Sequence, residues 1–150
     1  MTLFIAFTFL AAYNAGCMTT LQLQHYGIYP SVGQEHFAEY MRANNRAAAL
    51  PTILPGMLLL LSTVLLTVRS PGFVRPYEAA AALALNLVAL FSTFWWQRPI
   101  QGRMAESGYD ETLTRQLIAT NWIRTAAYWL TAALSIGVLT RVLAAVGSTR

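Results

Sequence analysis

The chain has 150 residues, of which 56% are hydrophobic and 11% are charged. Soluble domains carry about 25% charged residues, so these few charges cannot cover the surface of a soluble globule of this size. The ten basic residues are all arginines, and with six acids they give a net charge of +4. They are dispersed along the chain, which disfavours a nucleic-acid-binding surface. The composition therefore predicts one membrane domain over residues 1–150 and no nucleic-acid partner.

Four apolar segments are long enough to cross a membrane. A spanning helix needs about 20 mostly apolar residues, and the segments that meet this requirement are Leu3–Leu23, Ala47–Val68, Ala79–Trp96 and Leu117–Thr140. The fourth segment carries one internal charge, Arg124. The sequence predicts an all-α fold, a transmembrane four-helix bundle.

Helix-start signals precede the second and fourth spans. Ser31–Gln34 has the spacing of a capping box, and Ser107–Asp110 is similar, with Asp110 itself suited to cap the helix. A helix from Val32 to Val68 would be about 55 Å long, against a bilayer of about 40–45 Å with headgroups. We therefore expect helices two and four to extend beyond the membrane or to break. Pro51 and Pro55 are the expected positions of a break in helix two.

The distribution of arginine gives only a weak prediction of orientation. An even number of spans puts both termini and the second loop on one side, with Arg69, Arg75, Arg141 and Arg150. Arg42, Arg46, Arg98, Arg103 and Arg115 lie on the other side, so the positive-inside rule gives nearly a tie. The compact basic second loop and the terminal amine favour cytoplasmic termini. We predict a multi-pass protein of the cell membrane with both termini cytoplasmic, in contact with membrane lipids and with self-association left open.

Polar residues gather toward the membrane face formed by the first and third connections. In the fourth span, Asn121, Arg124, Thr125 and Tyr128 fall at i, i+3, i+4 and i+7, which is one face of a helix. Intramembrane polar residues usually face the bundle interior or a cavity. The expected partners of Arg124 are Glu35, Glu39 and Asp110. Two structural roles explain the presence of Arg124 in an apolar span equally well. It could form an ion pair that joins two helices, or its side chain could extend to the lipid headgroups.

Both histidines of the chain, His25 and His36, belong to this polar end. His36, Glu39 and Tyr40 stand at i, i+3 and i+4, and histidine titrates near neutral pH, which suits a general base. His25, His36, Glu35 and Glu39 do not have the spacing of a known metal motif, so we expect no metal and no cofactor. Histidines on a solvated interfacial helix are the alternative.

Aromatic and amide residues complete the candidate pocket. Trp96 and Trp129 suit the wall of a pocket for a flat aromatic ligand, and they equally suit an aromatic belt at the membrane interface. Asn45 and Arg46 lie on the helix that begins near Gln34. The single cysteine, Cys17, excludes an intramolecular disulfide.

The run Asn121-Trp122-Ile123-Arg124-Thr125, followed by Trp129, resembles the anthrone-oxygenase-like family of small four-helix membrane proteins. Pro99 after the third span, followed by a polar loop, fits the same resemblance. Characterised members are similar to cofactor-free oxygenases that oxidise an anthrone to an anthraquinone. The resemblance implies that Arg124 and Asn121 hold a phenolate or enolate and that His36 is the base.

We therefore expect a membrane enzyme that acts on a lipophilic small molecule of polyketide or terpenoid type. Cofactor-free oxygenation is the first choice, and cyclisation, isomerisation or hydrolysis would use the same kind of pocket. The predicted catalytic residues are His36, Glu39, Arg124 and Asn121. The predicted substrate-binding residues are Tyr40, Asn45, Arg46, Trp96, Tyr128, Trp129 and His25. The alternative is a non-enzymatic transporter subunit or scaffold with a structural polar cluster.

Overall fold

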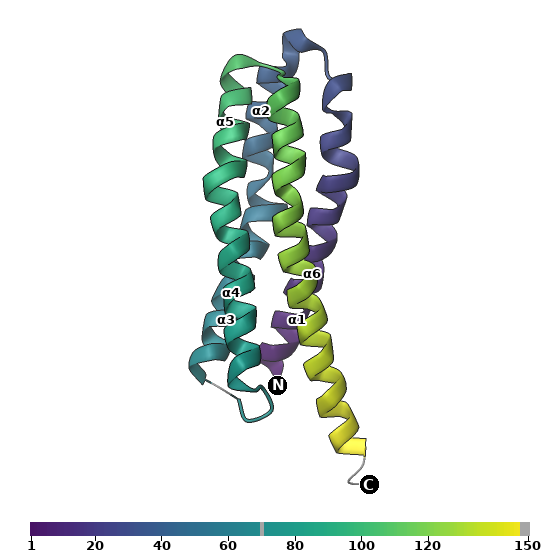
Figure 1. Ribbon diagram of the computed structural model, residues 1–150, viewed down its shortest axis with the longest axis vertical. Helices are drawn as coiled ribbons and strands as arrows, with labels where there is room; N and C mark the ends of the chain where they lie inside the picture. Colours follow the sequence, from purple (N-terminus) through teal and green to yellow (C-terminus); the bar gives the residue numbers. More distant parts are fainter. Residues whose placement is uncertain (70, 148–150) are drawn as a thin grey trace.

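The computed structural model describes residues 1–69 and 71–147, and within these ranges the chain is helical with no strand. Four helical stretches are long and apolar enough to cross a membrane: Thr2–Ser31, Ala49–Arg69, Pro76–Ser107 and Glu111–Gly147. They stand side by side along the long axis of the molecule (Figure 1). The predicted all-α four-helix bundle with four spans is confirmed.

Each of the first three spans is built from more than one helical segment. The elements in chain order are α1 (Thr2–Thr20), the π-helical turn η1 (Leu21–His25), the 3-10 turn η2 (Tyr26–Ser31), α2 (Gln34–Ala47), the π-helical turn η3 (Ala49–Ile53), α3 (Leu54–Arg69), α4 (Pro76–Ser92), the π-helical turn η4 (Thr93–Gln97), α5 (Arg98–Ser107) and α6 (Glu111–Gly147). In the bundle, α6 packs against α1 and α4, and α3 packs against the same two helices. The two termini and the loop between α3 and α4 lie at one end (Figure 1).

Proline and acidic residues set several helix ends. The helix that begins at Gln34 breaks before Leu54, at the π-helical turn that contains Pro51. Proline has no N–H to donate to the preceding turn, so the predicted break is confirmed there. Asp110 Oδ1 accepts a 2.8 Å hydrogen bond from the Leu113 backbone N–H, which confirms Asp110 as a cap. The capping box predicted at Ser31 is wrong, because Gly33 precedes α2 and makes no side-chain cap.

Helix α6 is longer than a membrane is thick, in line with the expectation for the fourth helix. Its 37 residues span about 55 Å, which exceeds the thickness of a bilayer with headgroups. Near its start, α6 packs with η2, α2 and α5 around a second apolar core, separate from the core of the spans. This second core contains Tyr26, Tyr29, Phe37, Met41, Ile100, Met104 and Leu117. The polar end of the bundle therefore carries its own packed layer.

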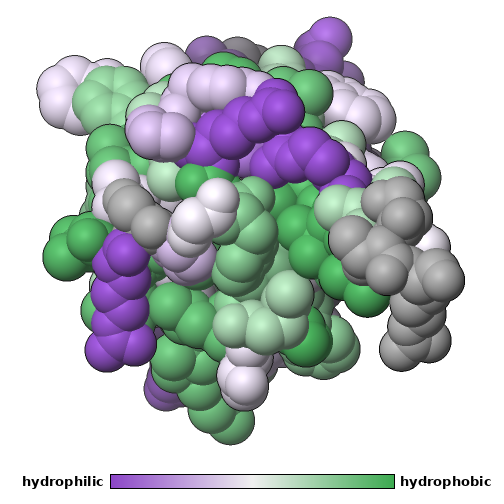
Figure 2. All heavy atoms as spheres, turned by 90° about the horizontal axis from the view of Figure 1, so that it is seen from below, coloured by the Kyte–Doolittle hydropathy of each residue, from purple (hydrophilic) through white to green (hydrophobic). Residues whose placement is uncertain are grey.

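The end that holds the termini contains an ion pair that the sequence did not suggest. Both terminal nitrogens of the Arg141 guanidinium, Nη1 and Nη2, donate to the buried Glu78 carboxylate, and Nη2 also donates to the Phe73 carbonyl at 2.9 Å. Glu78 in turn accepts from the Arg75 backbone N–H at 2.8 Å. Seen from this end, strongly hydrophilic side chains stand among apolar ones rather than covering the face (Figure 2). Arg141 thus ties the first turn of α4, through Glu78, and the preceding loop, through Phe73, to α6.

Candidate functional site

Arg124 lies inside the bundle and is 5% exposed. Its Nε donates to Asn121 Oδ1 at 3.0 Å, and Nη2 donates to the same oxygen. Nη2 also reaches Tyr26 Oη at 3.2 Å and Gln97 Oε1 at 3.3 Å, whereas Nη1 has a 3.4 Å contact with Thr93 Oγ1. The side chains that hold the guanidinium thus come from three elements: η2, which contributes Tyr26, η4, which contributes Thr93 and Gln97, and α6, which contributes Asn121.

All of these partners are neutral oxygens. Among the described residues, the ion pairs within 4.0 Å are Arg115–Glu111 and Arg141–Glu78, and neither involves Arg124. Glu35, Glu39 and Asp110, the partners expected from the sequence, are exposed and make no contact of this kind with it. A buried charge without a counter-charge is costly. An anion beside this guanidinium would therefore be strongly favoured.

Two buried glutamines from different π-helical turns hold the network against α6. Gln22 Nε2 donates to the Ile118 carbonyl at 3.1 Å, and its Oε1 accepts from Asn121 Nδ2 at 2.7 Å. Gln97 Nε2 donates to the Leu117 carbonyl at 3.2 Å, and its Oε1 accepts from Arg124. Asn121 is fully buried, and both the nitrogen and the oxygen of its side-chain amide have hydrogen-bond partners. The orientation of Arg124 is thereby fixed by the first and third spans.

Arg124 forms part of the wall of a cavity of about 430 Å³, a size typical of small-molecule sites. Side chains from every span line it. The polar members of the lining are His25, Tyr26, Asn44, Asn45, Thr52, Asn86, Thr93, Gln97, Arg98, Gln101, Arg124 and Tyr128, and the apolar members include Met18, Leu21, Pro51, Ile53, Met57, Leu60, Leu90 and Phe94. Polar and apolar residues thus contribute about equally to the lining of the cavity.

The three π-helical turns surround this cavity. Each contributes lining residues: Leu21 and His25 from η1; Pro51, Thr52 and Ile53 from η3; Thr93, Phe94 and Gln97 from η4. A π-helical turn widens the helix locally and is often found at functional sites. The presence of three such turns at the same cavity favours a functional site over three unrelated irregularities of the helices.

The structure brings four of the predicted site residues to the cavity: His25, Asn45, Arg124 and Tyr128. Asn121 lies behind Arg124 and positions it without lining the cavity. The predicted face of the fourth span is confirmed, because Asn121, Arg124, Thr125 and Tyr128 are all buried. The histidine that reaches the cavity is His25, at the end of η1.

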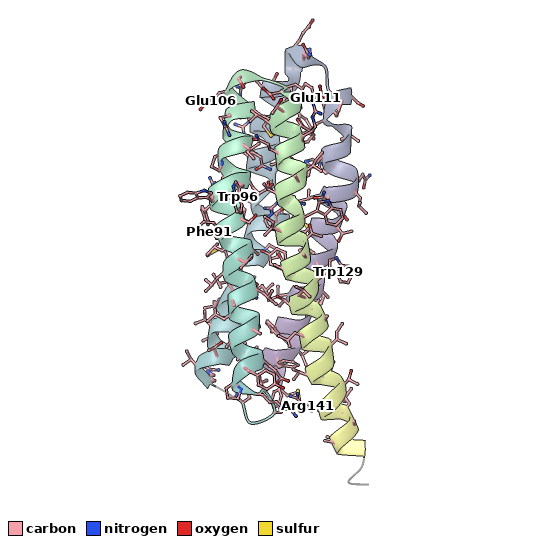
Figure 3. The ribbon with its side chains drawn as sticks, in the orientation of Figure 1. Phe91, Trp96, Glu106, Glu111, Trp129 and Arg141 are labelled. Carbon is pink, nitrogen blue, oxygen red and sulfur yellow. The ribbon has the colours of Figure 1, made fainter. Side chains whose placement is uncertain are left out.

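The other predicted residues do not line the cavity. His36, Glu39 and Arg46 are exposed on α2, because that helix buries Phe37 and Met41 instead. Trp129 is exposed and donates its indole N–H to Thr19 Oγ1 at 2.9 Å. Trp96 is half-buried and packs edge-on against Phe91, and Figure 3 shows it well above Trp129 along the bundle.

Tyr40 belongs to an aromatic cluster beside the cavity. Its ring centroid lies 6.5 Å from that of His25, 5.9 Å from Tyr29 and 6.0 Å from Phe37. Burial raises the pKa of the Tyr40 phenol above its ordinary value. Tyr40 therefore supports the position of His25 as a neutral side chain.

The sequence prediction of a site omitted Gln22, Tyr26, Thr93 and Gln97, which make the contacts to Arg124 and Asn121. The signal was present, since amides and a phenol inside or next to apolar spans are unusual and tend to be functional. Asn86 was also missed. It is buried in α4, lines the cavity and contacts Thr63 Oγ1 of α3 at 3.4 Å. The second and third spans therefore share a buried polar contact.

Exposed tryptophans mark the membrane depth of the site. Trp122 and Trp129 on α6 and Trp95 on η4 are exposed, as expected of an aromatic belt at the interface. Arg124 lies between Trp122 and Trp129 in the sequence, within about 8 Å of each along the helix axis. Glu106 and Glu111 lie beyond this level, whereas Arg141 is near the opposite end (Figure 3). Arg124 therefore lies at the level of these tryptophans along the bundle.

No family model, curated protein or solved structure matched this chain in the three comparisons made.

Proposed function

We propose that this chain is an integral membrane enzyme that binds a lipophilic small molecule in the cavity and holds an ionised oxygen of that molecule against Arg124. One observation carries the proposal: Arg124 is buried on the cavity wall, and its hydrogen bonds all go to neutral oxygens. Fixed cationic donors in a site of low dielectric stabilise a developing oxyanion strongly. An enolate or phenolate is such an anion.

We assign the role of base to His25 rather than His36. His25 lines the cavity, and its ring stands 5.7 Å from the ring of Tyr26, whose hydroxyl accepts from Arg124. His36 is exposed on α2 and is not part of the lining. A general base must come within hydrogen-bond reach of the substrate, and this requirement selects His25.

The proposed reaction is cofactor-free oxygenation of an anthrone-like polyphenol. His25 removes a proton from the acidic carbon, and Arg124 holds the resulting enolate oxygen. The carbanion forms a carbon–oxygen bond with dioxygen, and the proton on His25 returns to the peroxide. Elimination of water, which takes the second hydrogen from that carbon, leaves a carbonyl group. One anthrone and one dioxygen thus give one anthraquinone and one water, and cyclisation, isomerisation or hydrolysis would use the same base and anion site.

The proposal is tested with the purified protein in phosphatidylcholine nanodiscs, supplied with an anthrone and dissolved oxygen. Oxygen uptake and quinone absorbance are measured together for the unmodified chain, for Arg124→Gln and for Arg141→Gln as the control at the opposite end. We expect Arg124→Gln to lower the rate by about 10²–10³-fold and Arg141→Gln to retain it. A folded Arg124→Gln protein with an unchanged rate would contradict the proposed role.

The second candidate is a transporter subunit or scaffold in which the polar cluster is structural. Two observations favour it: the Arg124 network links three spans, and Asn86 with Thr63 places a polar contact between α4 and α3 at the inner end of the cavity. In that case Arg124→Gln should lower the thermal midpoint of the bundle, and neither the unmodified chain nor Arg124→Gln should turn over an anthrone. Measuring unfolding and turnover on the same samples separates the two functions.

We also propose that both termini are cytoplasmic. The described part of the end that holds them contains Arg69, Arg75 and Arg141, and Arg150 lies outside the described residues. The opposite end carries Arg42, Arg46, Arg98, Arg103 and Arg115, so the number of arginines alone gives nearly a tie, and the compact basic loop with Arg69 and Arg75 is what supports this orientation. A protease-sensitive tag placed at either terminus should be cleaved in inverted vesicles and protected in right-side-out ones, and the reverse pattern would refute this orientation.

A further inference from the structure

The mouth of the cavity lies between the second and third spans. Its lining residues from α1 and α6, such as Met18 and Arg124, are buried. The exposed lining residues come from the opposite side of the bundle. Ala47, Pro51 and Arg98 are exposed, and so are three larger apolar residues, of which Ile53 is 45% exposed, Met57 49% and Phe94 57%. These three side chains are apolar and belong to η3, α3 and η4. The opening is therefore lateral and rimmed mainly by apolar groups, with Arg98 at its polar edge.

The rim lies at the depth where the bilayer changes from acyl chains to headgroups. Phe94 directly precedes Trp95, an exposed member of the aromatic belt, and the guanidinium of Arg98 lies 5.8 Å from the Phe94 ring centroid. Arg98 is exposed one turn further toward the polar end. Exposed apolar residues at this depth contact lipid chains, whereas an arginine beside them reaches the headgroups. The mouth thus faces the leaflet on the polar side of the bundle.

The cavity is graded along its length. Its polar end carries Asn44, Asn45 and Gln101, whereas toward the bilayer centre it is lined by Gly56, Leu60 and Leu90, with the buried Asn86 as a polar residue at that end. From Arg98 down to Asn86 on the third span, it extends over about 18 Å of helix. Arg124, Thr93 and Gln97 lie between these two ends. A ligand that complements both the polar groups around Arg124 and the apolar lining has an acidic oxygen and an apolar body.

We infer that the ligand is an amphiphilic acid that enters laterally from this leaflet between η3 and η4, with its acidic group held at Arg124 and its apolar part directed toward Leu60 and Leu90. This inference rests on the proposed function, because it uses the same cavity and the same arginine. It adds the source of the ligand, which is the bilayer, and its chemical class. The charge of Arg124 selects the acid, and the apolar rim selects lateral access over access from water.

The experiment uses a 16-carbon fatty acid with a diazirine at the end of its chain, dissolved in phosphatidylcholine nanodiscs that contain the full chain. The initial rate of photo-labelling and the positions of the adducts are measured. Ile53→Trp and Met57→Trp narrow the mouth, and Leu61→Trp is the matched control on the lipid-facing side of α3, because Leu61 is exposed and does not line the cavity. Two further changes test the charge interaction: Arg124→Gln removes the cation from the protein, and the methyl ester of the probe removes the anion from the ligand.

We expect adducts in the segments 56–60 and 86–90, a loss of about 10-fold in labelling rate for the mouth variants, and an unchanged rate for Leu61→Trp. The acid should outcompete its methyl ester by about 10-fold or more, since a charge-assisted hydrogen bond is lost. The ester comparison and the adduct map need no variant, so they remain decisive if a substitution prevents folding.

The possible failures are distinguishable. Unchanged rates for both folded mouth variants, with labelling still dependent on Arg124 and on the free acid, would overturn lateral access and leave the proposed anion site intact. Adducts scattered over the lipid-facing surface, equal for acid and ester and for Arg124→Gln, would overturn the inference and the proposed function together.

Discussion

Asn121 Oδ1 accepts hydrogen bonds from both Nε and Nη2 of Arg124, one turn further along α6. The Asn121 amide nitrogen donates to Gln22 Oε1 at 2.7 Å, which fixes the orientation of the amide. The arginine is therefore held rigidly by a group that does not neutralise it. At the other end of the bundle, Arg141 is held by the Glu78 carboxylate. The two arginines differ in the charge of their partner, and this difference underlies the predictions below.

Asn121→Asp should retain the fold and abolish anion binding. The substitution is nearly isosteric and would convert a neutral acceptor into a carboxylate beside Arg124, so the guanidinium would no longer attract a ligand anion. We expect turnover of an anthrone to fall by about 10²-fold. The thermal midpoint should fall modestly, because the hydrogen bond that Asn121 Nδ2 donates to Gln22 Oε1 is lost. Oxygen uptake and thermal unfolding are measured on the same nanodisc samples. If Asn121→Asp retained turnover, Arg124 would not act as the anion site.

His25→Gln should remove activity, and His36→Gln should not. His25 lines the cavity, whereas His36 is exposed on α2. Loss of a positioned general base costs about 10²–10⁴-fold in rate, and we expect this loss in kcat for His25→Gln. His36→Gln is the matched control, because it makes the same chemical change outside the cavity. Equal activities of the two variants would exclude His25 as the base.

Gly56→Leu should fill the cavity. A Cβ at Gly56 would stand 3.4 Å from Tyr128 Oη and 3.7 Å from Asn14 Oδ1, which is ordinary contact. A Cβ is therefore accommodated at this position. The substitution gains up to about 0.8–1 kcal/mol in helix propensity, and we expect the rest of the leucine side chain to occupy the space lined by Met57 and Leu60. We expect the affinity for the fatty-acid probe to fall by about 10-fold or more, with no loss of stability.

Gly137→Leu is the control for that variant. Gly137 is exposed on α6, and a Cβ there meets nothing within 4 Å. It should gain a similar helix propensity and leave probe binding unchanged. A Gly56→Leu protein that binds the probe as well as Gly137→Leu would show that the ligand does not use this cavity.

Arg141→Gln should destabilise the bundle without affecting the site. The substitution would leave the buried Glu78 carboxylate without its cationic partner, and removing one partner of such a pair is unfavourable. We expect a lower thermal midpoint and an unchanged rate of anthrone turnover. Glu78→Gln together with Arg141→Gln should recover part of the lost stability, because no unpaired charge remains. A double variant no more stable than Arg141→Gln would argue against the ion pair as the cause.

The sequence by itself determined the four spans, the break at Pro51, the cap at Asp110 and the buried face of α6. Apolar length, proline chemistry and helical periodicity are local properties, so they can be inferred without knowing the neighbours of a helix. The sequence also predicts that polar residues gather at one end of the bundle. This prediction needs only the positions at which the apolar segments end.

Only the tertiary structure decided which of those polar residues meet. Arg124 contacts Tyr26 and Gln97, which are 98 and 27 residues away, and Arg141 contacts Glu78 at a separation of 63 residues. Periodicity gives the face of one helix, but not its rotation against the others. Three π-helical turns add to this, since each changes the angular position of the residues that follow it. For that reason the sequence favoured His36 as the base, whereas packing brings His25 to the cavity.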